Sequence, residues 1–133
     1  MNWLNEYDGD QIKGALNYVG PVGISVNAEC NSFQMYGSGL FYGTLCNTDS
    51  SSLDHAVTLV GYGYEDDTEY FLLRNSWGTS WGENGYMKIV NNGNGNGVCG
   101  MFLMPIIPTT TNLASTLISG FTAVAVAALY FAF

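Results

Sequence analysis

The stretch "AVTLVGYGYEDDTEYFLLRNSW", residues 56–77, decides the fold of this chain. It contains two apolar runs, "AVTLVGYG" and "EYFLLRNSW", which are rich in β-branched and aromatic residues. The acidic segment "YEDDT" separates them. Two such runs joined by a short polar turn are typical of a β-hairpin. We therefore predict a pair of antiparallel strands here.

The segments before the hairpin predict one helix and one more strand. "YDGDQIKGALNYVG", residues 7–20, reads as a short amphipathic helix with Asp10 as its N-cap and Gly20 at its end. The apolar residues that share one face of this helix are Ile12, Leu16 and Val19. Pro21 follows, and "VGISVNA" then has the composition of a strand.

The remaining segments complete a β-rich domain. Glycines interrupt the aromatic stretch "FQMYGSGLFYGTLCN", which predicts a loop. "GYMKIV" is a further strand, "NNGNGNG" is an open loop, and "VCGMFLMPII" closes the domain. We predict an α+β fold for residues 1–108, in which a twisted antiparallel β-sheet or barrel carries one short flanking helix.

Length and charge limit the classes of function. With 133 residues the chain is long enough for one ordinary domain. Eleven acidic residues against three basic ones give a net charge of -8. Nucleic-acid binding needs clustered Lys and Arg side chains that displace counterions, so this balance excludes that class of partner. It also argues against docking on an anionic lipid surface.

The C-terminal end has a different composition from the rest. Lys88 is the last charged residue, and "PTTTN" forms a linker before "LASTLISGFTAVAVAALYFAF", Leu113–Phe133. A helix of this length is about 31 Å long, which is the thickness of the hydrocarbon part of a bilayer. We predict a linker and a membrane segment over residues 109–133. The alternatives are a buried terminal helix, a misread end of the frame, or a signal for a GPI anchor with small residues at Asn112–Thr116.

The N-terminal end shows no secretory leader. "MNWLNEYDGDQ" has neither a basic n-region nor an apolar h-region. If the mature protein works outside the cytosol, we expect this chain to lack its own beginning.

His55 is the single histidine of the chain and stands next to the first strand of the hairpin. A lone histidine at such a position is usually structural. The segment "RNSWGTSWGENGY", Arg74–Tyr86, changes that interpretation, because two tryptophans among glycines suit the walls of a polar site. A catalytic imidazole needs one nitrogen held by a partner, and the amide oxygen of Asn75 can hold it without adding charge. Trp77 is placed to cover that hydrogen bond.

The segments "LDHAVTLVGYG" and "RNSWGTSWGENGY" closely resemble the His and Asn motifs of the papain-like cysteine peptidases, the cathepsin L and papain group. Three shorter segments, "GPVGISV", "YGSGLF" and "VCGM", resemble other motifs of the same family, and they occur in the family's order. The resemblance covers roughly residues 10 to 105. It implies the right-hand half of a papain-like peptidase domain.

The resemblance also implies roles for individual residues. His55 matches the catalytic base, and Asn75 matches the residue that orients it. Trp77 matches the aromatic shield of that pair, and Trp81 belongs to the neighbouring scaffold. The residues matching the substrate-binding wall are Ser25, Leu53, Asp54 and Met104. That wall is mostly apolar, which implies a preference for an apolar or aromatic side chain second from the scissile bond.

The chain departs from the family at the nucleophile. None of its three cysteines lies in a C-G-[SA]-C-[WY] motif, and the oxyanion glutamine is missing as well. The resemblance implies a disulfide between Cys46 and Cys99, which in turn implies an oxidising compartment. Cys30 is then an incidental thiol, or a partner for a cysteine in the missing N-terminal half.

Two hypotheses about function follow. The first is a cysteine-type endopeptidase that uses a Cys-His-Asn mechanism on polypeptide substrates and is present here as a partial chain, inactive by itself. The second is a non-catalytic, membrane-tethered binding module. We expect no cofactor and no metal, because one histidine and three scattered cysteines lack the paired spacing of a metal site. The expected location is a secretory or lysosome-like compartment or the cell surface.

Overall fold

The hairpin predicted from the sequence is confirmed. The computed structural model describes residues 2–5, 7–93 and 95–109. Strand β4, His55–Glu65, pairs antiparallel with strand β5, Thr68–Arg74. Asp66 and Asp67 form the two-residue turn, and both have positive φ values, 48° and 61°. Two consecutive positive φ angles define a type I′ turn, whose twist suits a hairpin.

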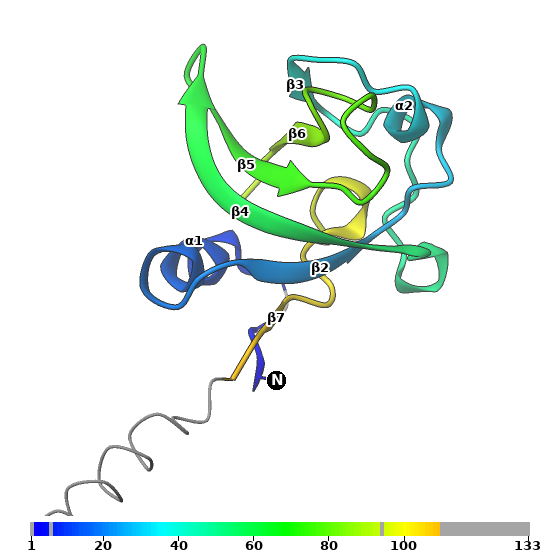
Figure 1. The fold of residues 1–133 in the computed structure, drawn as a ribbon. Coiled ribbons are helices and arrows are strands. Elements are labelled where there is room, and N and C mark those ends of the chain that lie inside the picture. The colour runs from blue at the N-terminus through cyan, green and yellow to red at the C-terminus, as the bar shows by residue number, and fades with distance from the viewer. Residues whose placement is uncertain (1, 6, 94, 110–133) are drawn as a thin grey trace, which may run out of the picture.

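The hairpin lies in the middle of a curled seven-stranded sheet (Figure 1). The strand order is β1-β7-β2-β4-β5-β6-β3. The remaining strands are β1 (Asn2–Trp3), β2 (Val22–Val26), β3 (Leu40–Phe41), β6 (Tyr86–Val90) and β7 (Ile106–Ile107). All neighbouring strands are antiparallel except β3 and β6, which run parallel. The sheet is therefore mixed, whereas the sequence predicted an antiparallel one.

The core fills the inner side of this curl. Alternate residues of each strand point inward, so Val22, Ile24 and Val26 of β2 are buried while the residues between them are partly exposed. Phe71 and Leu73 of β5 are fully buried in the same core. Burying one side chain of this size contributes roughly 1.5–3 kcal/mol. This core fixes the register of the strands that carry the site.

Helix α1, Gly9–Tyr18, is the predicted flanking helix, but its N-cap differs from the prediction. Asp8, rather than Asp10, accepts hydrogen bonds from the first turn, at 3.0 Å from Asp10 N and 3.1 Å from Gln11 N. Ile12 is fully buried, whereas Val19 is exposed. An ion pair between Lys13 Nζ and Glu69 Oε1, at 2.9 Å, joins the helix to β5.

The segment predicted as a loop contains regular structure. Helix α2, Asn31–Gln34, and strand β3 both fall within or beside it. Two single 3-10 turns, η1 (Ser50–Ser52) and η2 (Val98–Gly100), are also present. Elements of two to four residues are too short to show a hydrophobic period, so the sequence pattern does not reveal them.

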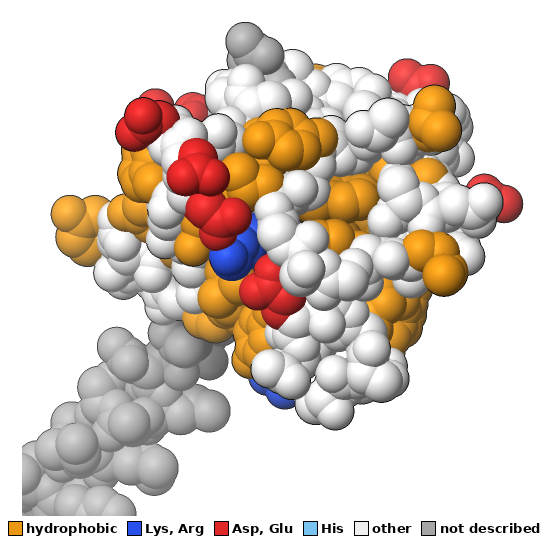
Figure 2. Space-filling model, turned by 90° about the horizontal axis from the view of Figure 1, so that it is seen from above, with side chains coloured by type: hydrophobic (Ala, Val, Ile, Leu, Met, Phe, Trp, Pro, Cys, Tyr) orange, Lys and Arg blue, Asp and Glu red, His pale blue; other side chains and the backbone are white. Residues whose placement is uncertain are grey.

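Acidic side chains are prominent at the hairpin end of the molecule. This end is at the top of Figure 1, and Figure 2 looks onto it from above. Acidic and basic side chains lie next to one another there, with apolar side chains visible between them (Figure 2). On the strands β4 and β6, Lys88 Nζ forms an ion pair with Glu65 Oε2 at 2.5 Å.

The predicted membrane segment, Leu113–Phe133, lies outside the described residues. Within the parts of the chain that the structure describes, no helix has the length and apolar character needed to cross a bilayer.

Candidate active site

The pairing of β4 with β5 brings His55 and Asn75 together. His55 begins β4, and Asn75 directly follows the last residue of β5. Because Thr58 of β4 pairs with Arg74 of β5, the two ends meet at the base of the hairpin. The distance from His55 Nε2 to Asn75 Oδ1 is 2.9 Å, which is a normal hydrogen bond. The proximity predicted for these two residues is therefore present.

The hydrogen bond determines which imidazole nitrogen is available for chemistry. Asn75 Oδ1 also accepts a hydrogen bond from Ser76 N at 2.7 Å, which identifies this atom as the oxygen of the amide. An oxygen of this kind only accepts, so His55 Nε2 must donate. The neutral ring then carries its proton on Nε2 and leaves Nδ1 free to accept one. This is the arrangement that a general base requires.

Aromatic rings shield the pair on two sides. The indole of Trp77 stacks on the imidazole of His55, with ring centroids 4.8 Å apart and planes inclined by 25°. Phe33 contacts the imidazole edge-on, at 6.5 Å and 80°. Asn75 is only 8% exposed, so water has little access to compete for its bond with His55. Trp77 thus lies against the imidazole, and its role as a shield of the pair stays a prediction.

Trp81 packs against the rings of Phe33 and Trp77. It is buried, and its indole Nε1 donates to the main-chain oxygens of Phe33 (3.2 Å) and Gln34 (3.1 Å). Its ring also contacts that of Trp77 edge-on, at 5.6 Å. Trp81 therefore joins α2 to the loop that carries Asn75 and Trp77.

An open hollow of about 480 Å³ lies beside the imidazole. Its lining residues are Ala28, Glu29, Gln34, Asp54, His55 and Trp77. Asp54 Oδ1 accepts a hydrogen bond from Ala28 N at 2.7 Å, so the segment before His55 is fixed to the segment after β2. No cysteine lines this hollow among the described residues.

The predicted substrate-binding residues fall into separate places. Ser25 and Met104 together line a second hollow of about 280 Å³, formed by β2, β4 and the segment up to β7. Asp54 lines the hollow beside His55 instead. Leu53 lines neither hollow and packs against Gly100, where an added Cβ would lie 2.7 Å from Leu53 Cδ2. The substrate-binding role of these four residues stays a prediction.

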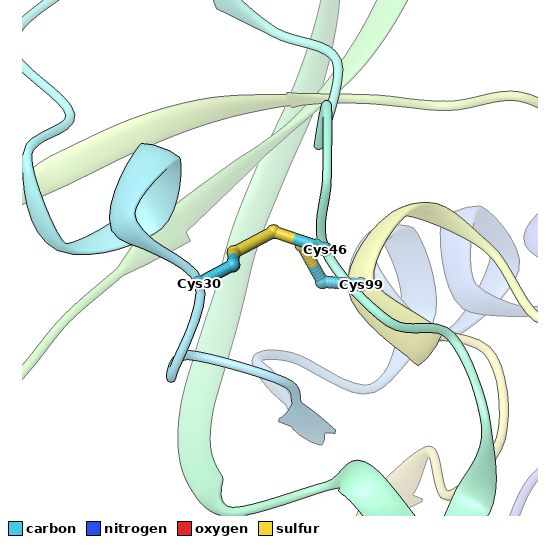
Figure 3. Close-up of side chains that lie close together, drawn as sticks. All are labelled: Cys30, Cys46 and Cys99. Carbon is cyan, nitrogen blue, oxygen red and sulfur yellow. A yellow bond between two sulfur atoms is a disulfide. The ribbon is translucent and has the colours of Figure 1, made fainter.

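The predicted disulfide between Cys46 and Cys99 is wrong in this structure. Cys46 is bonded to Cys30, and Cys99 is a free, buried thiol (Figure 3). The physical reason is the position of Cys30 at the N-cap of α2, which brings its Cα to 5.2 Å from that of Cys46. This separation lies in the usual range for disulfides.

The three cysteines are close together although they are scattered in the sequence. Their sulfur atoms all lie within 4.8 Å of one another. Two of them are bonded to each other, which leaves Cys99 as the thiol. Burial, with a smaller contribution from the charge of Asp54, raises the pKa of Cys99 to about 12. Such a thiol is almost entirely protonated at neutral pH and is a poor nucleophile.

Phe33 is a residue of the site that the sequence pattern did not indicate. It is fully buried, and it contacts the rings of His55, Trp77 and Trp81. Its helix is a single turn, so no period in the sequence points to it. The cluster becomes visible only when α2 is placed in space.

Comparison with known proteins identifies the class to which this site belongs. Residues 2–109 match the profile described as papain family cysteine protease, and the chain belongs to this family. Digestive cysteine proteinase 1 of Homarus americanus is 44% identical over 98 residues, covering 74% of this chain and 29% of that protein. Cathepsin L of Sarcophaga peregrina is 40% identical over 107 residues, covering 80% of this chain and 30% of that protein.

A solved structure shows the same fold. Bromelain from Ananas comosus, solved in complex with an inhibitor, superimposes with a TM-score of 0.73 at 34% identity. The match covers 80% of this chain and 48% of the bromelain chain. The present chain thus spans less than a third of these two curated relatives and about half of the solved one.

Proposed function

We propose that this chain supplies the base-bearing half of a cysteine-type endopeptidase site. His55 acts as the general base and acid, and Asn75 orients it. The nucleophilic thiol comes from another polypeptide segment, because no cysteine of the described residues lines the hollow beside His55, and because Cys99 is buried. The observation that supports the proposal most directly is the 2.9 Å bond between His55 Nε2 and Asn75 Oδ1 under the ring of Trp77.

The proposed mechanism follows from the free Nδ1 of His55. This nitrogen accepts the proton of the incoming thiol, and the resulting thiolate attacks the carbonyl carbon of a peptide bond. The imidazolium then gives the proton to the leaving amine as the C–N bond breaks, which leaves an acyl-thioester. Water, deprotonated by the same nitrogen, releases the acid and regenerates the thiol. Asn75 adds no charge, so the thiolate is the main counter-charge of the imidazolium.

Membership of a peptidase family supports polypeptides as the substrates. The hollow lined by Ser25 and Met104 supports a more specific proposal about which substrate side chain is bound. Most of its lining is apolar, and it contains no charged residue. We expect it to accept an apolar or aromatic side chain of the substrate. The disulfide between Cys30 and Cys46 supports the proposal that the protein works in an oxidising compartment of the secretory or lysosome-like type.

A second candidate function is a binding module without catalysis, tethered to a membrane by Leu113–Phe133. One observation favours it, namely that no cysteine among the residues that the structure describes lines the hollow beside His55. In that case the residues that line the two hollows bind a polypeptide but do not cleave it.

Complementation separates the two functions. The purified chain alone should hydrolyse no dipeptidyl fluorogenic substrate. It should then be refolded with the remaining segment of the Homarus americanus relative, the part outside the region matched by this chain. Recovered hydrolysis that is blocked by an epoxide-type thiol inhibitor would support the peptidase.

Variants make the complementation specific. His55→Ala should abolish the recovered hydrolysis, while Asn17→Ala, remote from the site, should leave it unchanged. A complex that forms and binds peptide without hydrolysing it would favour the binding module. Hydrolysis by the isolated chain would contradict the proposal that the thiol comes from elsewhere.

A further inference from the structure

The three cysteines form a cluster whose sulfur atoms all lie within 4.8 Å of one another, although the residues stand in three separate segments. Cys30 caps α2, Cys46 lies in the loop after β3, and Cys99 lies in η2. Figure 3 shows the side chain of Cys99 reaching toward the disulfide. A disulfide with a third thiol so close is in a position to exchange partners.

We propose that Cys46 exchanges its disulfide partner between Cys30 and Cys99, and that Cys30 becomes a reactive thiol when Cys99 is bonded. In this step the thiolate of Cys99 attacks Sγ of Cys46. The Cys30–Cys46 bond breaks, the Cys46–Cys99 bond forms, and Cys30 leaves as a thiolate. Cys99 gives its proton to solvent and Cys30 takes one back, so the step needs no oxidant and no reductant.

The surroundings of the two alternative thiols differ. Cys99 is fully buried, whereas Cys30 is only partly buried at the start of α2. The hydroxyl of Ser32 donates to Thr44 O at 2.8 Å and lies 3.6 Å from Cys30 Sγ and 3.7 Å from Cys46 Sγ. By rotating its single O–H, it can donate to whichever of these two sulfur atoms carries a charge. A thiolate is therefore better accommodated on Cys30 than on Cys99.

The rate of exchange should depend on pH. Burial first, and the negative charge of Asp54 second, raise the pKa of Cys99 to about 12. The thiolate of Cys99 is rare at neutral pH, so exchange is slow there. Its population rises about tenfold for each pH unit until the pKa is reached. Once freed, Cys30 can attack a small external disulfide, forming a mixed disulfide and releasing one thiolate.

The test is disulfide mapping of the 133-residue chain, purified without reductant. Samples are held at pH 7, 8 and 9, quenched in acid, treated with N-ethylmaleimide, and digested with pepsin at low pH so that bonds do not rearrange. Mass spectrometry then reports which cysteine carries the label. We expect both pairings, label on Cys30 as well as on Cys99, and an approach to the final ratio that is roughly tenfold faster per pH unit.

Two variants each allow only one of the two disulfide pairings. Cys99→Ser should hold the Cys30–Cys46 bond, and Cys30→Ser should hold the Cys46–Cys99 bond, each without further change at pH 9. A single pairing in the unmutated chain that persists at pH 9, with label on one cysteine alone, would overturn the proposal. This readout involves no peptide hydrolysis, so its failure leaves the proposed function untouched.

Discussion

Trp81 donates its indole N–H to the main-chain oxygen of Phe33, and the two rings lie 5.5 Å apart. This contact joins α2 to the loop that carries Asn75. Because Phe33 in turn touches His55 and Trp77, the position of the imidazole depends on a residue that does not contact it.

Replacing Trp81 by Phe should test this support. The variant keeps an aromatic ring but loses the donor shared by Phe33 O and Gln34 O. We expect the free energy of unfolding to fall by about 1–3 kcal/mol, since buried oxygens lose a partner. Urea unfolding followed by circular dichroism measures this change. Trp77→Phe is the matched control, because Trp77 is 40% exposed and should cost less stability. An equal loss in both variants would contradict the supporting role of Trp81.

Replacing Asn75 by Ala should change the proton position on His55. The variant removes the oxygen that accepts from Nε2, so the neutral imidazole should change from a pure Nε2–H form to a mixture of the Nε2–H and Nδ1–H tautomers. Two-bond ¹⁵N–¹H correlation spectra of the single histidine report the tautomer directly. Asn17→Ala, which removes an exposed hydrogen bond to Tyr62, should leave the spectrum unchanged. A pure Nε2–H tautomer in Asn75→Ala would show that another group holds the ring.

Replacing Asp67 by Gly should stabilise the hairpin. Asp67 has φ of 61°, a conformation that glycine adopts without steric cost. The variant also removes one of two adjacent acidic residues in an acidic segment. We expect a gain of about 0.5–1 kcal/mol in the free energy of unfolding, measured by urea titration. Asp10→Gly is the opposite control, since it places glycine inside α1 and should destabilise.

Tyr36 should make stability fall at alkaline pH. Burial, the largest cause, raises the pKa of its phenol from 10.0 to about 12. The unfolded chain therefore loses this proton first, and above pH 10 the folded state binds more protons than the unfolded state. The contribution of Tyr36 to the free energy of unfolding is therefore fully present below pH 10 and declines as the pH rises toward 12.

Absorbance of tyrosinate at 295 nm should reveal one phenol that titrates near pH 12. Tyr36→Phe should remove this late step and flatten the fall in urea midpoint between pH 10 and 12. Tyr18→Phe, whose ring is 90% exposed, should leave both in place. A late step that survives in Tyr36→Phe would assign it to another residue.

The sequence was most informative where a regular pattern extends over many residues. The hairpin of β4 and β5 and the strands β2 and β6 were predicted from runs of apolar, β-branched and aromatic residues. Helix α1 was predicted from the apolar residues that share one of its faces. The pairing of His55 with Asn75 followed from the family motifs. The single-turn helix α2 and the ring contacts of Phe33 were not predicted, since neither has a local signature.

The cysteines show a second limit of sequence reasoning. The family resemblance implied a bond between Cys46 and Cys99, whereas the structure joins Cys46 to Cys30. Resemblance treats Cys30 as a spare residue because the family motifs do not include it. Only the three-dimensional position of α2 shows that the sulfur atom of Cys30 lies within 4.8 Å of the sulfur atoms of Cys46 and Cys99.

The hairpin also separates the part of the chain that can change length from the part that cannot. His55 and Asn75 meet at its base, while Asp66 and Asp67 close its opposite end. An epitope inserted between the two aspartates would lengthen a solvent-facing ribbon and leave the imidazole in place. One extra residue between His55 and Thr58 would instead turn every later side chain of β4 to the other face. The far end of this ribbon is thus a natural place to attach a reporter or an affinity handle.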